Sequence, residues 1–160
     1  MKRVPKITFL SCAFLCGILI SCVDPHKRES FFYDLGEEGL IKDHQYVFYP
    51  LSEFSDSLQN SLFKIDVSVR YKSSCRLKEL PLKIEYSSLE ADSVYDTKIQ
   101  IPLFGDDDSL KGKGNYGLYD ETVTLFKSHP FEEGFFISIS STEEDTHGII
   151  SLGIVCDINN

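Results

Sequence analysis

The chain contains no tryptophan and no apolar run long enough to cross a lipid bilayer. Tryptophan offers the largest ring for stacking on a sugar, so a glycan-binding face would depend on the 12 phenylalanines and 8 tyrosines. The main apolar stretch, residues 7–20, has 14 residues, whereas a transmembrane helix needs about 20. The first absence argues against a tryptophan-lined sugar site, and the second argues against a membrane-spanning helix.

Sequence signatures of catalysis are also missing. No Gly-x-Ser-x-Gly elbow occurs, and the histidines are not spaced as pairs of metal ligands: they are His26, His44, His129 and His147. Residues 132–133 and 143–145 could supply paired carboxylates for glycoside hydrolysis. Both runs are more typical of polar turns beside a strand. We therefore predict a protein without enzyme activity, without a cofactor and without a bound metal ion.

Positive charge is scarce beyond position 21, because this part of the chain contains 13 Lys and Arg but 25 Asp and Glu. Such an excess of acidic residues argues against nucleic acid as a partner, because phosphates attract Lys and Arg. It also argues against electrostatic binding to anionic lipid through a cluster of basic residues. The acidic surface keeps the protein soluble and self-repelling.

The N-terminal segment has the form of a bacterial lipoprotein signal. Three basic residues precede the apolar stretch, and the stretch leads into Leu19-Ile20-Ser21-Cys22. A small residue directly before a cysteine marks the cleavage site, and the cysteine thiol takes a diacylglyceryl group. We predict that residues 1–21 are removed, that Cys22 carries lipid, that residues 22–30 are a tether and that residues 31–160 form one domain.

The predicted lipid places the protein at a membrane of the cell envelope. Only one acidic residue, Asp24, occurs in the three positions after Cys22, fewer than a surface-export signal would be expected to have. The sequence therefore favours a position facing the periplasm, and the outer membrane over the inner one.

Two further cysteines, Cys75 and Cys156, lie beyond the predicted tether. A disulfide between them would close a loop of about 80 residues and stabilise the fold by roughly 4–5 kcal/mol in the chain-entropy model. The alternative is that Cys156 is a small buried hydrophobic residue and Cys75 a loop thiol. The sequence leaves both interpretations open.

Apolar and polar side chains alternate with a period of two along most of the chain, which indicates half-buried strands. The predicted strands are residues 63–70, 80–87, 97–101, 135–140 and 150–158, with weaker ones at 46–49 and around 118–119. Residues 121–127 fit a short helix and a strand equally well. Polar turns between the strands predict an all-β, single-domain antiparallel β-sandwich, either Ig-like or jelly-roll-like. Pro81 and Pro102 predict edge positions.

The stretch 105–117 combines three consecutive aspartates, at 106–108, with Gly112, Gly114 and Gly117. Aspartates could bind calcium and glycines could cradle a phosphate. The spacing of an EF-hand and the Gly-Lys-Ser/Thr ending of a P-loop are both absent. We predict a solvated turn in which glycine supplies backbone freedom.

Several short motifs follow the lipoprotein signal in a recognisable order. They are Tyr46-Val47-Phe48-Tyr49, Val67-Ser68-Val69-Arg70-Tyr71, Leu80-Pro81-Leu82-Lys83-Ile84, Ile101-Pro102-Leu103, the glycine-rich segment 112–120 and the closing segment 147–154. This order resembles the GldH family of gliding motility-associated lipoproteins of Bacteroidetes. The resemblance implies an envelope lipoprotein associated with the gliding and type IX secretion apparatus, with no enzyme activity. Of the family's functional positions, it carries over the lipid-bearing cysteine, at Cys22.

Two functions remain to be separated. The first is a non-enzymatic accessory or scaffold protein that docks other envelope proteins. The second is a lipid-anchored module that binds a glycan or another small ligand, which the sequence disfavours. A concave face lined by Tyr and Phe would favour the second function, whereas aromatic residues exposed on flat faces or edge strands would favour protein docking.

Overall fold

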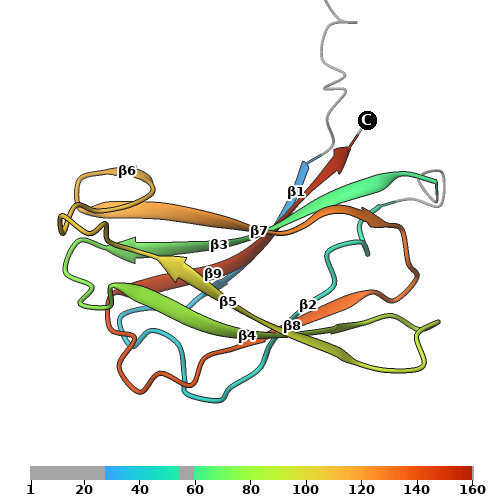
Figure 1. Cartoon of the computed structure of the whole chain (residues 1–160), viewed down its shortest axis with the longest axis horizontal. Helices are drawn as coiled ribbons and strands as arrows, with labels where there is room; N and C mark the ends of the chain where they lie inside the picture. The colour runs from blue at the N-terminus through green and yellow to red at the C-terminus, as the bar shows by residue number, and fades with distance from the viewer. Residues whose placement is uncertain (1–27, 55–59, 160) are drawn as a thin grey trace, which may run out of the picture.

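The computed structural model of the protein describes residues 28–54 and 60–159, which fold into two antiparallel sheets (Figure 1). The strands are β1 (Arg28–Asp34), β2 (Tyr46–Phe48), β3 (Leu62–Lys72), β4 (Glu79–Ser87), β5 (Tyr95–Pro102), β6 (Lys113–Asn115), β7 (Leu118–Pro130), β8 (Phe136–Ser140) and β9 (Ile149–Asn159). The five-stranded sheet has the order β1-β9-β3-β7-β6, and the four-stranded sheet has the order β2-β8-β4-β5. The prediction of an all-β antiparallel sandwich is confirmed.

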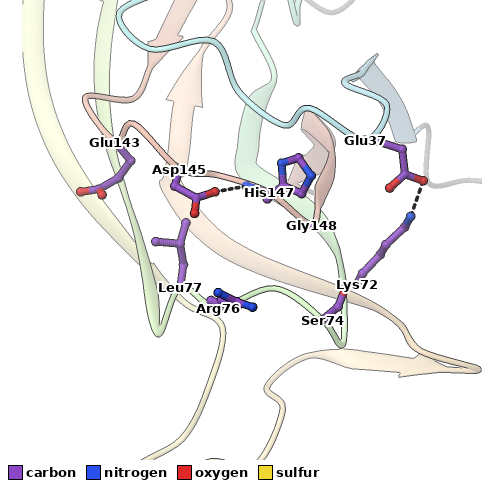
Figure 2. Close-up of a pocket in the computed structure, with 9 residues that line it drawn as sticks. All are labelled: Glu37, Lys72, Ser74, Arg76, Leu77, Glu143, Asp145, His147 and Gly148. Atoms are coloured by element: carbon purple, nitrogen blue, oxygen red, sulfur yellow. Dashed lines mark hydrogen bonds and ion pairs between the residues drawn. The ribbon is translucent and has the colours of Figure 1, made fainter.

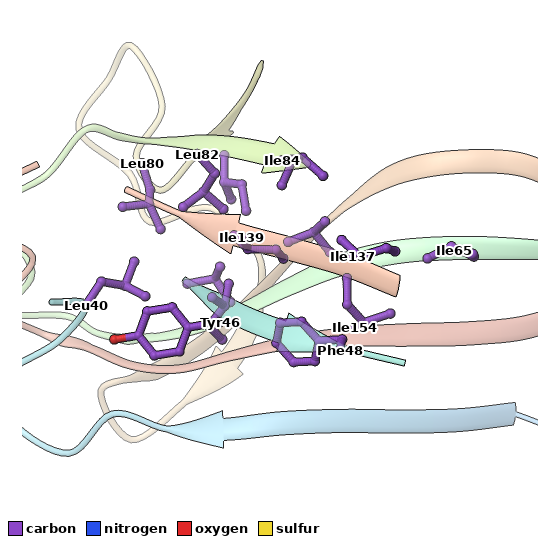
Figure 3. Close-up of a cluster of buried hydrophobic side chains, with 14 of the residues drawn as sticks. Leu40, Tyr46, Phe48, Ile65, Leu80, Leu82, Ile84, Ile137, Ile139 and Ile154 are labelled. Atoms are coloured by element: carbon purple, nitrogen blue, oxygen red, sulfur yellow. The ribbon is translucent and has the colours of Figure 1, made fainter. Parts of the chain in front are cut away.

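The core lies between the two sheets and is built by the alternating strands. On β3, the side chains of Ile65, Val67 and Val69 are completely buried, while the residues between them point to the outer face. Ile84 of β4 and Ile139 of β8 meet them from the other sheet (Figure 3). Because each buried aliphatic side chain contributes about 1.5–3 kcal/mol, this interface is the main source of stability. None of the described residues forms a helix that could span a membrane.

Residues 121–127, which fitted a helix or a strand, belong to β7. This strand pairs with β3 from Leu118, opposite Lys72, to Pro130, opposite Leu62. The local sequence does not contain this information, because the hydrogen bonds that decide it come from a strand about 50 residues earlier.

The two prolines have different positions. Pro102 lies on β5, at the edge of the four-stranded sheet, as predicted. Pro81 lies on β4, an inner strand, so the prediction of an edge position was wrong for this residue. The ladder between β4 and β8 begins only at Lys83 and Ser140. The Pro81 carbonyl lies beyond the end of β8 and accepts a hydrogen bond from Ser141 Oγ. A backbone N–H at position 81 would therefore have no partner on β8, and the proline, which lacks this N–H, costs no hydrogen bond there.

β1 was not predicted as a strand, and it starts inside the predicted tether. Arg28, Glu29 and Ser30 pair with residues 157, 156 and 155 of β9. Arg28, Glu29 and Ser30, which the sequence analysis assigned to the tether, are therefore part of the five-stranded sheet. The alternation is hidden because β1 is an edge strand on which most side chains are exposed. β6, with only three residues, was also missed.

The possible disulfide between Cys75 and Cys156 does not form, because both side chains are buried free thiols. Cys75 packs against Gly148 at one end of the sandwich, whereas Cys156 lies eight positions along β9 from that glycine. Eight extended residues span roughly 25 Å, and a disulfide needs Cα atoms within about 7 Å. Of the two open interpretations, the buried hydrophobic residue is the one that describes Cys156.

Burial makes the stability of the fold sensitive to alkaline pH. Desolvation raises the pKa of the Cys156 thiol from 9.0 to about 12 and that of the Tyr71 hydroxyl from 10.0 to about 12. The unfolded chain releases these protons at lower pH than the folded chain does. The contribution of these two groups to the free energy of unfolding is therefore fully present below pH 9. It is expected to be lost as the pH rises toward 12.

Urea denaturation at several pH values between 8 and 11 checks this expectation. Cys156→Ala should flatten the decline that begins near pH 9, while the decline due to Tyr71 remains. Equal pH slopes for the variant and the wild type would contradict the assignment to Cys156.

Candidate functional site

A cleft lies at one end of the sandwich, where β3 ends and β9 begins (Figure 2). Its volume is about 560 Å³. We call it the end cleft, and it is lined by Glu37, Lys72, Ser74, Arg76, Leu77, Glu143, Asp145, His147 and Gly148. Lys72 is the last residue of β3, and the other lining residues come from three connections: β1–β2, β3–β4 and β8–β9. The cleft lies at the end of the sandwich opposite Arg28, where the described chain enters.

Close backbone contacts fix the floor of the end cleft. The Lys72 N–H donates to the Gly148 carbonyl at 2.8 Å, which joins the end of β3 to the start of β9. A Cβ on Gly148 would lie 2.9 Å from the Cα of Cys75, and Gly148 has φ +91°. Only glycine satisfies both the close approach and the left-handed backbone. The two connections therefore pack directly against each other beneath the cleft.

A single buried hydroxyl holds the third connection in place. Thr146 Oγ1 accepts a hydrogen bond from the Leu40 N–H at 2.7 Å and donates one to the Leu40 carbonyl at 3.0 Å. Thr146 is only 2% exposed, so both backbone groups of Leu40 depend on it rather than on water. This contact joins residues that are 106 positions apart and supports the cleft wall that carries Asp145 and His147.

The cleft presents charges of both signs. Lys72 Nζ pairs with Glu37 across its rim, and this hydrogen bond lowers the pKa of the Glu37 carboxyl below its usual value. Arg76, Glu143 and Asp145 take part in no ion pair within the described ranges. Their charges are available to a binding partner.

Ser74, Asp145 and His147 share the cleft, and these are residue types found in hydrolase triads. The Asp145 carboxylate, however, accepts a hydrogen bond at 3.1 Å from the backbone N–H of His147. In a triad, that carboxylate would hold the imidazole ring instead. The contact is a local turn that shapes the connection, and it does not orient the histidine for catalysis.

The exposed aromatic residues lie elsewhere, mostly along strand edges. Phe32 and Tyr33 are on β1, and Tyr49 follows β2. Together with Phe31, Val47, Phe48, Ser52 and Glu53 they line a second hollow of about 360 Å³, which we call the edge groove. The Tyr33 hydroxyl donates to the Val47 carbonyl at 2.9 Å, so this one side chain connects the edges of the two sheets.

The end of the glycine-rich stretch forms a hairpin. Tyr116 and Gly117, with φ +52° and +82°, form the tight turn between β6 and β7, and Tyr116 is 98% exposed at its tip. Asp107 accepts hydrogen bonds from Ser109, and Asp108 pairs with Lys78 at 3.0 Å. Over residues 28–54 and 60–159, no group of three His, Cys, Asp or Glu could hold a metal ion.

The predicted site residues are thus widely separated. Cys22 lies outside the described residues. Cys75 is buried beside the end cleft and Cys156 is buried on β9. Of the two acidic runs, residues 143–145 contribute to the end cleft, while Glu132 and Glu133 line a different hollow near Phe54. Sequence reasoning missed the contributions of Lys72, Arg76 and His147 to the cleft.

Comparisons with known proteins give little further information. No protein-family model matches the sequence, and no curated protein matches it. Among solved structures, the fold is similar to that of Eiger TNF from S. frugiperda, with a TM-score of 0.39 and 7% sequence identity. The match covers 64% of this chain and 62% of that one. So distant a likeness says nothing about function.

Proposed function

We propose that the protein is a lipid-anchored component of the bacterial cell envelope that serves as a non-enzymatic accessory or scaffold for a protein machine. The lipoprotein signal ending at Cys22 and the resemblance to the GldH family point to the gliding and type IX secretion apparatus. The acidic composition supports docking of proteins rather than nucleic acid. A position facing the periplasm, at the outer membrane, accords with the residues after Cys22.

The observation that carries the proposal is the placement of the exposed aromatic side chains. They occupy strand edges and turn tips, as Phe32, Tyr49, Tyr95 and Tyr116 illustrate. The end cleft, which is larger than the edge groove, has no Phe or Tyr in its lining. The edge groove does gather Phe and Tyr side chains, but they lie along the exposed edges of β1 and β2. Aromatic residues exposed on strand edges support docking of proteins over binding of a glycan.

The end cleft is the surface best suited to an envelope partner. Arg76 offers a planar guanidinium, and Glu143 and Asp145 offer carboxylates within the same hollow (Figure 2). Complementary charges of this kind give specificity to a protein interface. Because residues 23–27 join the proposed anchor to Arg28, at the opposite end of the sandwich, the anchor leaves the cleft uncovered.

Crosslinking of the intact lipoprotein in its native envelope, followed by mass spectrometry, tests the proposal. We expect gliding or type IX secretion components to be recovered with the wild type and strongly reduced with Arg76→Glu. Lys98→Glu, on β5 and away from the cleft, is the matched control and should behave as the wild type. Undiminished recovery with Arg76→Glu would exclude the cleft as the docking site.

Absence of any envelope component from the crosslinked material would overturn the scaffold function. The alternative is then a lipid-anchored module that binds a glycan or another small ligand. The edge groove, with Tyr33 and Tyr49 in its wall, would be its binding site. Glycan screening with Tyr49→Ala as the control would test that alternative.

A further inference from the structure

The sandwich has four strand edges, and they differ in how open they are. β6 has three residues, and its ladder with β7 leaves only Gly114 facing outward. β2 also has three residues, and its outward carbonyl, on Val47, already accepts the Tyr33 hydroxyl. β5 is long but carries Lys98 and ends at Pro102, which are features that discourage edge pairing. β1 is the remaining edge, with seven residues and no proline or lysine.

The backbone of β1 has a regular row of outward groups. The Leu35 N–H donates to the Ile150 carbonyl at 2.9 Å, so odd-numbered residues of this segment face β9. Arg28, Ser30, Phe32 and Asp34 therefore direct their N–H and carbonyl groups away from the sheet. Such a row can accept a further strand by backbone hydrogen bonding.

A second copy of β1 fits this row in one register. Antiparallel pairing centred on Phe31 sets Ser30 opposite Phe32 of the second copy and Arg28 opposite Asp34 of the second copy. All four outward residues then meet outward residues, as hydrogen bonding requires, and each side chain stays on its own face. A shift of the register by one residue sets outward residues opposite inward ones, so no backbone hydrogen bond forms between the two copies. A shift by two residues keeps the hydrogen bonds but no longer sets Arg28 opposite Asp34 of the second copy.

Charge complementarity selects this register. Arg28 lies at one end of β1 and Asp34 at the other, and both are exposed. The two-fold symmetry of the pairing forms the Arg28–Asp34 contact twice. Arg28 also lies 3.6 Å from Asp157 on β9, and its forked guanidinium can contact a second carboxylate. We propose that the protein forms a symmetric homodimer by pairing of β1 with β1 of a second copy, which joins the two five-stranded sheets.

The edge groove supplies an apolar site for this dimer. In the centred register, Phe31 of the second copy lies directly opposite Phe31, at the narrow spacing of about 4.5 Å between Cα atoms. Phe31 and Val47 line the groove next to this position. The two Phe31 side chains would cover each other beside the groove, and the apolar surface that they remove from water would stabilise the pair.

The dimer is expected to be weak in solution and stronger on a membrane. A single strand pair with one apolar contact is a small interface, so we expect a dissociation constant on the order of micromolar. Confinement of both copies to one membrane would raise their effective concentration. Six residues along the strand separate Arg28 from Asp34, so the Arg28 residues of the two copies lie about 20 Å apart along β1. Because both anchors would enter the same membrane, β1 would run along the membrane surface. The pairing itself does not depend on the proposed lipid anchor.

Charge reversal tests the dimer with the full-length protein, by sedimentation and native mass spectrometry in mild detergent. Arg28→Asp alone and Asp34→Arg alone should each weaken dimerisation at least tenfold, because each sets like charges opposite one another. The double variant Arg28→Asp/Asp34→Arg should restore the wild-type affinity to within a few fold. Lys98→Asp on the β5 edge is the control and should leave the dimer unchanged.

Ser30→Pro provides an independent variant, because it removes an outward N–H without removing a bond to β9. It should abolish the dimer while the melting temperature stays near that of the wild type. A wild type that remains monomeric at high protein concentration would overturn the proposal, and so would a double variant as weak as the single ones. Because the readout is the mass of the homotypic complex, its failure is distinct from failure to recover envelope components.

Discussion

Replacement of Thr146 by valine is expected to lower the free energy of unfolding by about 3 kcal/mol. Valine has nearly the same shape as threonine, so the packing around position 146 is kept. The Leu40 N–H and carbonyl, however, both lose the hydroxyl that satisfies them. Each unpaired buried group costs about 1–3 kcal/mol, and a total unfolding free energy of about 5–15 kcal/mol leaves little reserve.

Urea denaturation measures this loss as a lower midpoint with an unchanged slope. Thr146→Ser is the matched control, because it keeps the hydroxyl and removes only a methyl group, at a cost of about 1 kcal/mol. If valine were tolerated as well as serine, the hydroxyl would not be the contact that fixes the loops. Hydrogen exchange at Leu40 gives a local readout, and the valine variant should lose protection there first.

The loops around Thr146 also show where sequence reasoning ends. Strands β3, β4, β8 and β9 were predicted because most of their apolar residues recur with a period of two, which indicates one face turned to the core. Thr146 lies in a polar connection in which no such pattern exists. Its contribution to stability depends on Leu40, 106 positions earlier. No pattern in either local segment predicts that contact.

The end cleft illustrates the same limit for a functional site. Glu37, Arg76 and Asp145 each lie in a polar connection and carry no recognisable spacing. They meet only because β1, β3 and β9 are neighbours in one sheet and place their connections at the same end. The acidic run 143–145 was identified from the sequence as a polar turn, but its role as a cleft wall requires the strand order.

β1 was missed for a different physical reason. Phe31, Phe32 and Tyr33 are consecutive aromatic residues, so the period of two cannot be read from hydrophobicity. In the structure, Phe31 packs on the core, while Phe32 covers Gly153 on the outer face, where a Cβ would lie 2.2 Å from its ring. An aromatic residue over a strand glycine is a known means of stabilising an edge. The first three residues of this edge strand were therefore assigned to the tether, and the rest of it was placed in the domain without being recognised as a strand.

Substitution of Cys22 by alanine is expected to abolish lipidation completely. Without its thiol the residue cannot take a diacylglyceryl group, and the acyl chains are the proposed anchor. Because each buried methylene contributes about 0.8 kcal/mol, loss of two chains should reduce membrane partitioning on the order of 10⁴-fold or more. Detergent phase separation and the intact mass of the purified protein measure partitioning and the lipid directly.

Cys75→Ala is the matched control for the anchor. Cys75 is a buried thiol inside the folded domain, and burial raises its pKa, so it is neither exposed nor ionised for acylation. This variant should keep both the lipid mass and the detergent-phase partitioning of the wild type. A Cys22→Ala protein that partitions as the wild type does and keeps the mass of the lipid would exclude lipidation at Cys22.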